Sequence, residues 1–112
     1  MAARMKRGEI WTVSGHDYAG KPRPAVLLQD DLFASVASAT VCPLTTNPTD
    51  APAFRPSVEP SEQNGLHRPS RLMVDKITTL PKSRLGTRLG HLSDEDVVRL
   101  NRAVLVFLGL AG

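Results

Sequence analysis

The chain has 112 residues and a formal net charge of +3, with 41% hydrophobic and 22% charged residues. This length suits one domain with a single core, and the balance of apolar and charged residues argues against intrinsic disorder. No apolar run approaches the ~20 residues of a membrane span, and no apolar segment follows the basic N-terminus as in a secretory signal. We therefore expect a single domain over residues 1–112 that works in the cytoplasm without a membrane contact.

The first half of the chain predicts three strands. Glu9–Val13 alternates between apolar and polar residues, and Arg23–Gln29 is a more apolar and more deeply buried strand. Residues 16–21 between them form a polar, glycine-bounded loop. Residues 30–33 are typical of a short helical turn, and Ala37–Pro43 resumes a strand pattern before a segment rich in proline and asparagine.

The second half predicts two further strands. Phe54, Pro56 and Val58 alternate with polar residues and indicate an edge strand, the position in a sheet that tolerates proline. A loop is expected over Glu59–Pro69, followed by a strand over Arg71–Thr79. Short strands at about ten-residue spacing, joined by turn residues, indicate a small antiparallel barrel or sandwich.

The C-terminal segment changes from strand to helix periodicity. Ser93 precedes three acidic residues, which is typical of a helix N-cap, and apolar residues then recur at helical spacing. The members of this apolar stripe are Val97, Leu100, Val104, Phe107 and Leu108. The pattern predicts one helix over about residues 94–109.

Cys42 is the only cysteine, which excludes an intramolecular disulfide and a cysteine-based zinc site. Because its neighbours are apolar, we expect the thiol to pack in the core. No HxH or HExxH pattern occurs, and the acidic clusters read as a turn and a helix start. The sequence therefore predicts no metal and no other cofactor.

Basic residues gather in two segments. Residues 1–29 hold five basic residues and two acids, and residues 63–92 hold six basic residues and one acid. Ten of the fourteen basic residues are arginine, whose planar guanidinium suits bidentate phosphate contacts. The two segments form one basic face if the fold brings them together, although a merely solvated surface would have the same composition.

Two junctions between a strand and a polar loop are candidates for anion binding. Arg23 lies where a polar loop enters an apolar strand, and Thr45 and Thr46 follow the end of the next strand. A fixed guanidinium and hydroxyl or backbone N–H donors at strand ends are the groups that grip a phosphodiester.

These junctions lie within a series of motifs that resembles the MazF/PemK family of toxin ribonucleases. The chain contains RGEIW, RPAVLL, CPLTT, VDKITTL and RLGHLSDED in this order, followed by an apolar terminal helix. The resemblance extends from about Met5 to Leu110. It implies a mainly β chain with a C-terminal helix, an SH3-like antiparallel β-barrel that pairs as a homodimer.

The same resemblance implies an activity and its partners. The family cleaves single-stranded RNA without a metal, leaving a 2′,3′-cyclic phosphate and a 5′-hydroxyl, and a cognate acidic antitoxin neutralises it. On this basis Arg23 and Thr45 are the catalytic residues. The sequence does not decide whether mRNA, tRNA or rRNA is the target.

Residues near these two are candidates for proton transfer and RNA binding. An arginine is a poor proton acceptor at neutral pH, so we interpret Arg23 as an electrostatic clamp and His16 as a possible acid or base. Tyr18 suits stacking on a base, although it equally suits packing, and Asp17 is a candidate for an acid that many relatives carry in a longer loop. Lys21, Thr46 and Asn47 complete the set of expected RNA-binding residues.

Two other functions remain open at this stage. A toxin of the same fold can poison DNA gyrase through protein contacts, as the related CcdB proteins do. A degenerate member of the fold would bind RNA without cleaving it. The pair Arg23 and Thr45 favours the nuclease, because an inhibitor that binds protein has no need of a phosphate clamp.

Overall fold

The computed structural model describes residues 5–15, 21–48 and 50–111. These residues form seven strands, three short 3-10 helices and one α-helix. The strands are β1 (Glu9–Val13), β2 (Arg23–Leu27), β3 (Ser38–Thr45), β4 (Ser57–Val58), β5 (Ser70–Leu72), β6 (Thr78–Pro81) and β7 (Leu85–His91). The 3-10 helices are Asp31–Phe33, Val74–Lys76 and Lys82–Arg84, and helix α1 is Asp94–Phe107.

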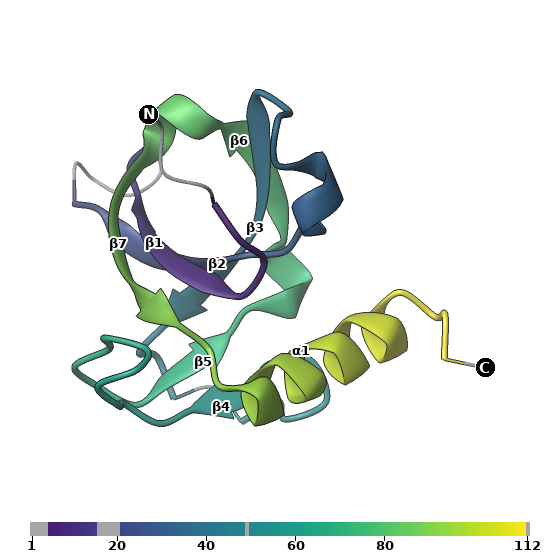
Figure 1. Ribbon diagram of the computed structural model, residues 1–112. Helices are drawn as coiled ribbons and strands as arrows, with labels where there is room; N and C mark the ends of the chain where they lie inside the picture. Colours follow the sequence, from purple (N-terminus) through teal and green to yellow (C-terminus); the bar gives the residue numbers. More distant parts are fainter. Residues whose placement is uncertain (1–4, 16–20, 49, 112) are drawn as a thin grey trace.

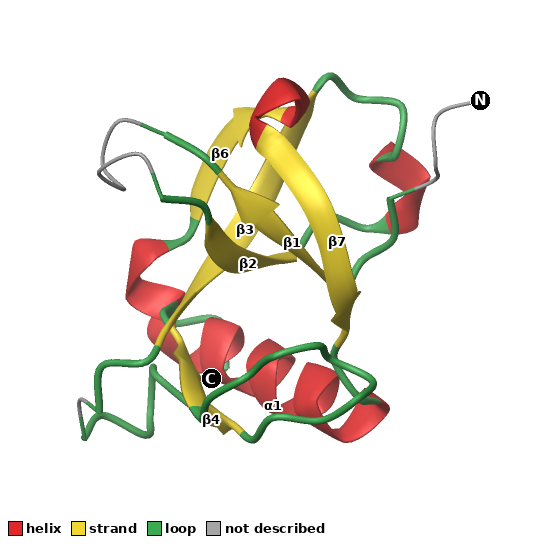
Figure 2. Cartoon of the chain, turned by 90° about the vertical axis from the view of Figure 1, so that its left-hand side faces the viewer, coloured by secondary structure: helices red, strands yellow, loops and turns green. Residues whose placement is uncertain are grey.

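All strand pairs are antiparallel, and they follow the order β4-β5-β3-β2-β1-β7, with β6 also paired to β3. Figure 1 shows β1, β2, β3, β6 and β7 curving around a common axis, with β4, β5 and α1 beside one end of this barrel. Figure 2, turned by 90°, again shows α1 beneath the barrel. The predicted mainly β fold, an antiparallel barrel with a C-terminal helix, is confirmed.

Two apolar clusters lie on opposite faces of the sheet because side chains alternate along each strand. The first fills the barrel and contains Trp11, Val13, Ala25, Leu27, Ala39, Val41 and Leu80. The second lies between the sheet and α1 and includes Ile10, Val26, Cys42, Leu44, Val58, Leu72 and Leu100. Cys42 is fully buried in this second cluster, so its predicted role in core packing is confirmed.

Helix α1 starts where the sequence predicts. The Ser93 side chain accepts a hydrogen bond from the Asp96 backbone N–H at 3.1 Å, which satisfies one of the free donors of the first turn. The helix ends at Phe107, two residues before the predicted 109, and Gly109 follows with a φ of 73°. A glycine in this left-handed conformation ends helices readily because it has no Cβ.

The strand predicted over Arg71–Thr79 is wrong in its extent. β5 pairs with the end of β3 at Leu44 and Thr45, whereas β6 pairs with the start of β3 from Ser38 to Val41. The chain must therefore travel along β3 between the two ladders, and the 3-10 helix Val74–Lys76 makes this step. Its turn keeps Val74 in the core and directs Asp75 towards Arg55.

The observed ends of other strands differ less from the predicted ones. β2 ends at Leu27 and not at Gln29, whose side-chain oxygen accepts a hydrogen bond from the Thr40 backbone N–H at 2.8 Å. β3 continues to Thr45, beyond the predicted end at Pro43. The predicted edge strand is confirmed at the end of the sheet, although β4 retains only Ser57 and Val58.

Strand β7 has no counterpart in the sequence predictions. Its LGTRLGH sequence is half-buried or exposed throughout, so it lacks the alternating pattern of a strand with one buried face. The strand forms because β1 offers it a backbone edge, with irregular register between Ile10 and Val13. Glycine is needed at Gly90, where a Cβ would overlap the Gln63 carbonyl oxygen and lie 2.7 Å from the Asn64 carbonyl carbon.

We expect Gly90→Ala to lower the free energy of unfolding by about 1–3 kcal/mol or more, because the added methyl group meets backbone that cannot rotate away. Chemical denaturation followed by circular dichroism measures the loss. Gly86→Ala in the same strand is the comparison, since its Cβ would meet the Thr12 side-chain oxygen at 2.6 Å, and turning that side chain away breaks only its hydrogen bond from the Thr87 backbone N–H. Equal losses in the two variants would contradict this account.

Candidate functional site

The two candidate catalytic residues lie at neighbouring strand ends. In the antiparallel ladder between β2 and β3, Ala25 is opposite Pro43. The ladder ends at this pair, and Arg23, two residues before Ala25, and Thr45, two residues after Pro43, lie just beyond it at adjoining ends of the two strands. Arg23 is exposed, and Thr45 is half-buried. The fold therefore brings together two residues that are 22 positions apart in the sequence.

The backbone of Arg23 is held in the sheet on its other side as well. It pairs with Val13 at the end of β1, and Val13 is buried inside the barrel. The strand therefore presents the exposed Arg23 side chain from a backbone fixed by the barrel core. A rigid strand end of this kind limits the reorganisation needed when an anion binds.

The Thr45 hydroxyl group already accepts one hydrogen bond within the chain. Its Oγ1 accepts a hydrogen bond from the Asn47 backbone N–H at 3.1 Å, in the turn that follows β3. This contact leaves the hydroxyl hydrogen available to donate to a bound oxygen. Thr46 and Asn47 are exposed beside it.

The loop before β2 is described only in part. Lys21 is exposed two residues before Arg23. The predicted residues His16, Asp17 and Tyr18 lie outside the described residues. The candidate RNA-binding set is thus located at Lys21, Thr46 and Asn47, which lie next to the two strand ends.

An ion pair anchors the segment that follows Thr45. Arg55 donates two hydrogen bonds to the Asp75 carboxylate, both at 2.9 Å, and both side chains are largely buried. The hydrogen bond from Arg55 holds the pKa of Asp75 below its usual value. This pair ties the loop after β3 to the 3-10 helix between β5 and β6.

The buried thiol in this region is not a nucleophile. Burial and, to a lesser extent, the nearby Asp75 carboxylate raise the pKa of Cys42 to about 12. The thiol is therefore neutral at physiological pH, whereas only the ionised thiolate acts as a nucleophile.

Sequence reasoning missed one residue of the site. Arg71 in β5 is directly opposite Thr45 in the ladder between β3 and β5, and it is half-buried. Only the long-range pairing of β3 with β5 places it there. The candidate site therefore consists of Thr45, Arg71 directly opposite it on β5, and Arg23 at the adjoining end of β2.

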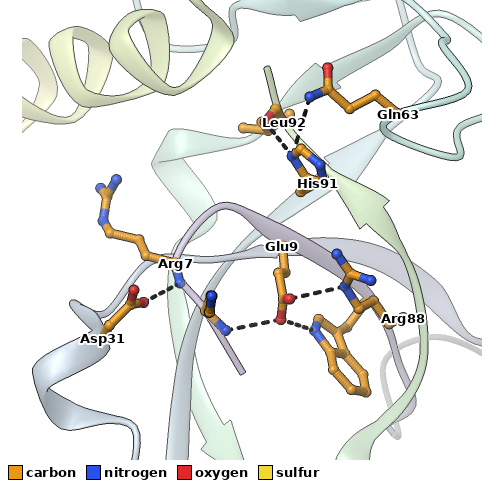
Figure 3. Close-up of polar contacts among 9 residues, drawn as sticks. Arg7, Glu9, Asp31, Gln63, Arg88, His91 and Leu92 are labelled. Carbon is orange, nitrogen blue, oxygen red and sulfur yellow. Dashed lines mark hydrogen bonds and ion pairs between the residues drawn. The ribbon is translucent and has the colours of Figure 1, made fainter. Parts of the chain in front are cut away.

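A second polar cluster lies at the opposite end of β1. Figure 3 shows the buried Glu9 carboxylate beside Arg88, and the two form an ion pair at 2.9 Å. Glu9 also accepts hydrogen bonds from the Lys6 backbone N–H at 2.9 Å and from the Trp11 indole N–H at 3.2 Å. An open cavity of about 310 Å³ adjoins this cluster. Because donors already satisfy the carboxylate, the cluster reads as a structural connection between the N-terminal segment and β7.

Two further features of the described residues bear on function. Within residues 5–15, 21–48 and 50–111, no group of three or more His, Cys, Asp or Glu side chains is arranged to hold a metal ion. The α-helix of this same part of the chain is too short and too polar to cross a membrane.

Residues 6–108 match the model of a family described as PemK-like, MazF-like toxins of type II toxin-antitoxin systems. The chain belongs to this family. A curated relative from Mycolicibacterium smegmatis, named probable endoribonuclease MazF, is 51% identical over 109 residues, which cover 96% of this chain and 100% of the relative. The resemblance seen in the sequence motifs is therefore confirmed for this MazF-like toxin.

Solved structures agree with this assignment. The Mycobacterium tuberculosis toxin MazF-mt6 is 26% identical with a TM-score of 0.80, and the match covers 93% of this chain and 99% of that one. An endoribonuclease in complex with its cognate antitoxin, from a mycobacterial species, is 24% identical with a TM-score of 0.81. That match covers 96% of this chain and 98% of the other, and it shows the shared MazF fold.

Proposed function

We propose that this MazF-like toxin is a metal-independent endoribonuclease that cleaves single-stranded RNA with a sequence preference. The β2–β3 ladder, which ends next to Arg23 and Thr45, is the observation that carries the proposal. The 51% identical relative, named a probable endoribonuclease, supports the same activity. Fold alone would not do so, because one fold can host unrelated functions.

In the proposed reaction the substrate supplies its own nucleophile. The 2′-oxygen next to the scissile phosphate attacks phosphorus, the bond from phosphorus to the 5′-oxygen breaks, and a 2′,3′-cyclic phosphate remains. One proton leaves the 2′-hydroxyl and one is delivered to the departing 5′-oxygen. No water or metal ion is required in this step.

Arg23 and Thr45 stabilise the charge that develops on phosphorus. The Arg23 guanidinium donates to two phosphate oxygens, and the Thr45 hydroxyl donates its free hydrogen to one of them. Lys21, Thr46 and Asn47 bind the adjoining RNA, together with Asp17 and Tyr18 of the preceding loop. The guanidinium stays protonated at neutral pH, so another group must exchange protons.

His16 is the proposed titrating group. We expect the cleavage rate to change with pH around ~6–7, the range in which an ordinary histidine titrates. His16→Ala should flatten this part of the profile, which a change in folding would not do. His67→Ala is the control, since His67 is exposed in the loop between β4 and β5. A pH profile that is identical in the wild type and in His16→Ala would exclude His16 from proton transfer.

We also propose that the toxin is a homodimer. The outer side of α1 exposes Val98 and Leu105, whose exposed fractions are 54% and 44%. An apolar helix face of this kind favours a partner surface, and the family resemblance makes a second copy the proposed partner. An acidic antitoxin would compete with RNA for the basic surface around Arg23, so its inhibition should weaken as salt rises.

Sedimentation at micromolar concentration is expected to show a species near twice the chain mass of 12.1 kDa. Leu105→Glu should shift this species towards the monomer, because it places a charge in the apolar contact. A wild-type monomer that still cleaves RNA would contradict the proposed dimer but not the proposed cleavage reaction.

A direct assay separates the proposed activity from the other functions of this fold. The purified toxin is incubated with a long structured RNA and, in parallel, with DNA gyrase. We expect RNA cleavage and no effect on gyrase. Gyrase inhibition without cleavage would overturn the proposal.

A further inference from the structure

Thr45 lies in the β3–β5 ladder and just beyond the end of the β2–β3 ladder. In the β3–β5 ladder it is opposite Arg71, and the β2–β3 ladder ends at Ala25 and Pro43, two residues from Arg23 and from Thr45. Arg71 is in turn opposite Ser57 in β4. Thr45, Arg71 and Ser57 therefore form one row across β3, β5 and β4, and Arg23 lies at the adjoining end of β2.

This row lies on the face of the sheet that does not contact α1. The alternate residues Leu44, Leu72 and Val58 point the other way and are buried in the cluster that contains Leu100 of α1. Side chains that are opposite one another across a ladder share a face. Thr45 and Arg71 therefore project on the same side of the sheet, away from the helix.

The surroundings of Arg71 differ from those of the other arginines. Among the described residues, Arg7, Arg55, Arg88 and Arg99 all use their guanidinium groups in hydrogen bonds or ion pairs within the chain. No such contact among these residues involves the Arg71 guanidinium. Yet Arg71 is half-buried, whereas Arg23, Arg68, Arg84 and Arg102 are exposed. Its stem is packed while its charge remains available for a ligand.

Distances across the sheet fit an extended ligand. Neighbouring strands lie about 4.8 Å apart, so the Arg71 backbone is about 5 Å from Thr45, and Arg23 lies farther away, at the end of the strand on the other side of β3. One phosphate held between Arg23 and Thr45 thus leaves Arg71 free to contact the next phosphate along the strand. A lysine or arginine at such a position adds affinity without reading the base.

We infer that Arg71 binds the phosphate adjacent to the scissile one, so that the RNA backbone runs across the sheet from β2 towards β4. This inference rests on the proposed ribonuclease function and adds a positioning residue to it. Arg71 would increase binding of substrate and transition state equally. Its loss should therefore raise KM and leave kcat nearly unchanged.

Binding of a substrate that is not cleaved tests the inference. The probe is an RNA oligonucleotide spanning a mapped cleavage site, with a single deoxyribose at the cut. Its Kd is measured at several salt concentrations for the wild type, Arg71→Ala, Arg71→Gln and Arg102→Ala. Arg102 is the matched control because it is exposed on α1, beyond the opposite face of the sheet.

We expect both Arg71 variants to bind about tenfold more weakly, as for loss of one charged hydrogen bond. The slope of log Kd against log salt should fall by about 0.7, the value for one phosphate contact on a single strand. Arg102→Ala should keep the wild-type slope. Arg71→Gln keeps most of the packed stem, so it reports on the charge if Arg71→Ala folds poorly.

Two results would overturn the role of Arg71 without contradicting the proposed ribonuclease function. In the first, both Arg71 variants bind like the wild type. In the second, they bind more weakly with an unchanged salt slope, which indicates a structural role. A wild-type protein that neither binds nor cleaves any RNA would instead overturn the proposed function itself.

Discussion

Replacing either Arg23 or Thr45 by alanine is expected to slow RNA cleavage by about 100-fold or more. This is the scale of losing one preorganised donor that acts on a developing oxyanion. Each loss should appear mainly in kcat, because the contacts strengthen as charge builds on the phosphate. Single-turnover cleavage of a defined RNA measures it.

Conservative variants make this test specific. Thr45→Ser keeps the hydroxyl group and should retain most of the rate, whereas Arg23→Lys keeps the charge but loses the guanidinium fork and should fall between the wild type and alanine. Folding should be preserved, since Arg23 is exposed and Thr45 is only half-buried. Wild-type cleavage by a folded alanine variant would remove that residue from the mechanism.

A single deoxyribose at the cleavage position is expected to abolish cleavage, because it removes the attacking 2′-oxygen. The same oligonucleotide should still bind and act as an inhibitor. A deoxyribose placed several nucleotides away is the matched control and should leave cleavage intact. Addition of EDTA should also leave the rate unchanged. Activity that is lost in EDTA and restored by magnesium would contradict the proposed chemistry.

Local sequence patterns were sufficient for the elements that carry a strong periodic signal. β1 matches its predicted bounds of Glu9–Val13, and α1 begins directly after the predicted cap at Ser93. In both elements the apolar residues recur with the period of the structure they form. The helix also has a capping side chain at its start. Burial of Cys42 followed from its apolar neighbours in the same way.

Long-range pairing explains what local patterns could not predict. β7 forms because β1 offers it a partner edge, and β5 and β6 separate because they pair with opposite ends of β3. Neither strand pairing can be recognised from the pattern of residues that are close in the sequence. The same limit applies to the site, since Arg71 reaches Thr45 only through the β3–β5 register.

Chemical analysis of the RNA ends produced by the wild-type toxin tests the central claim most directly. Transesterification by the 2′-oxygen predicts a 2′,3′-cyclic phosphate on one fragment and a 5′-hydroxyl on the other. These ends should form in EDTA and disappear in Arg23→Ala. Fragments that carry a 5′-phosphate and a 3′-hydroxyl would show attack by water and would contradict the account.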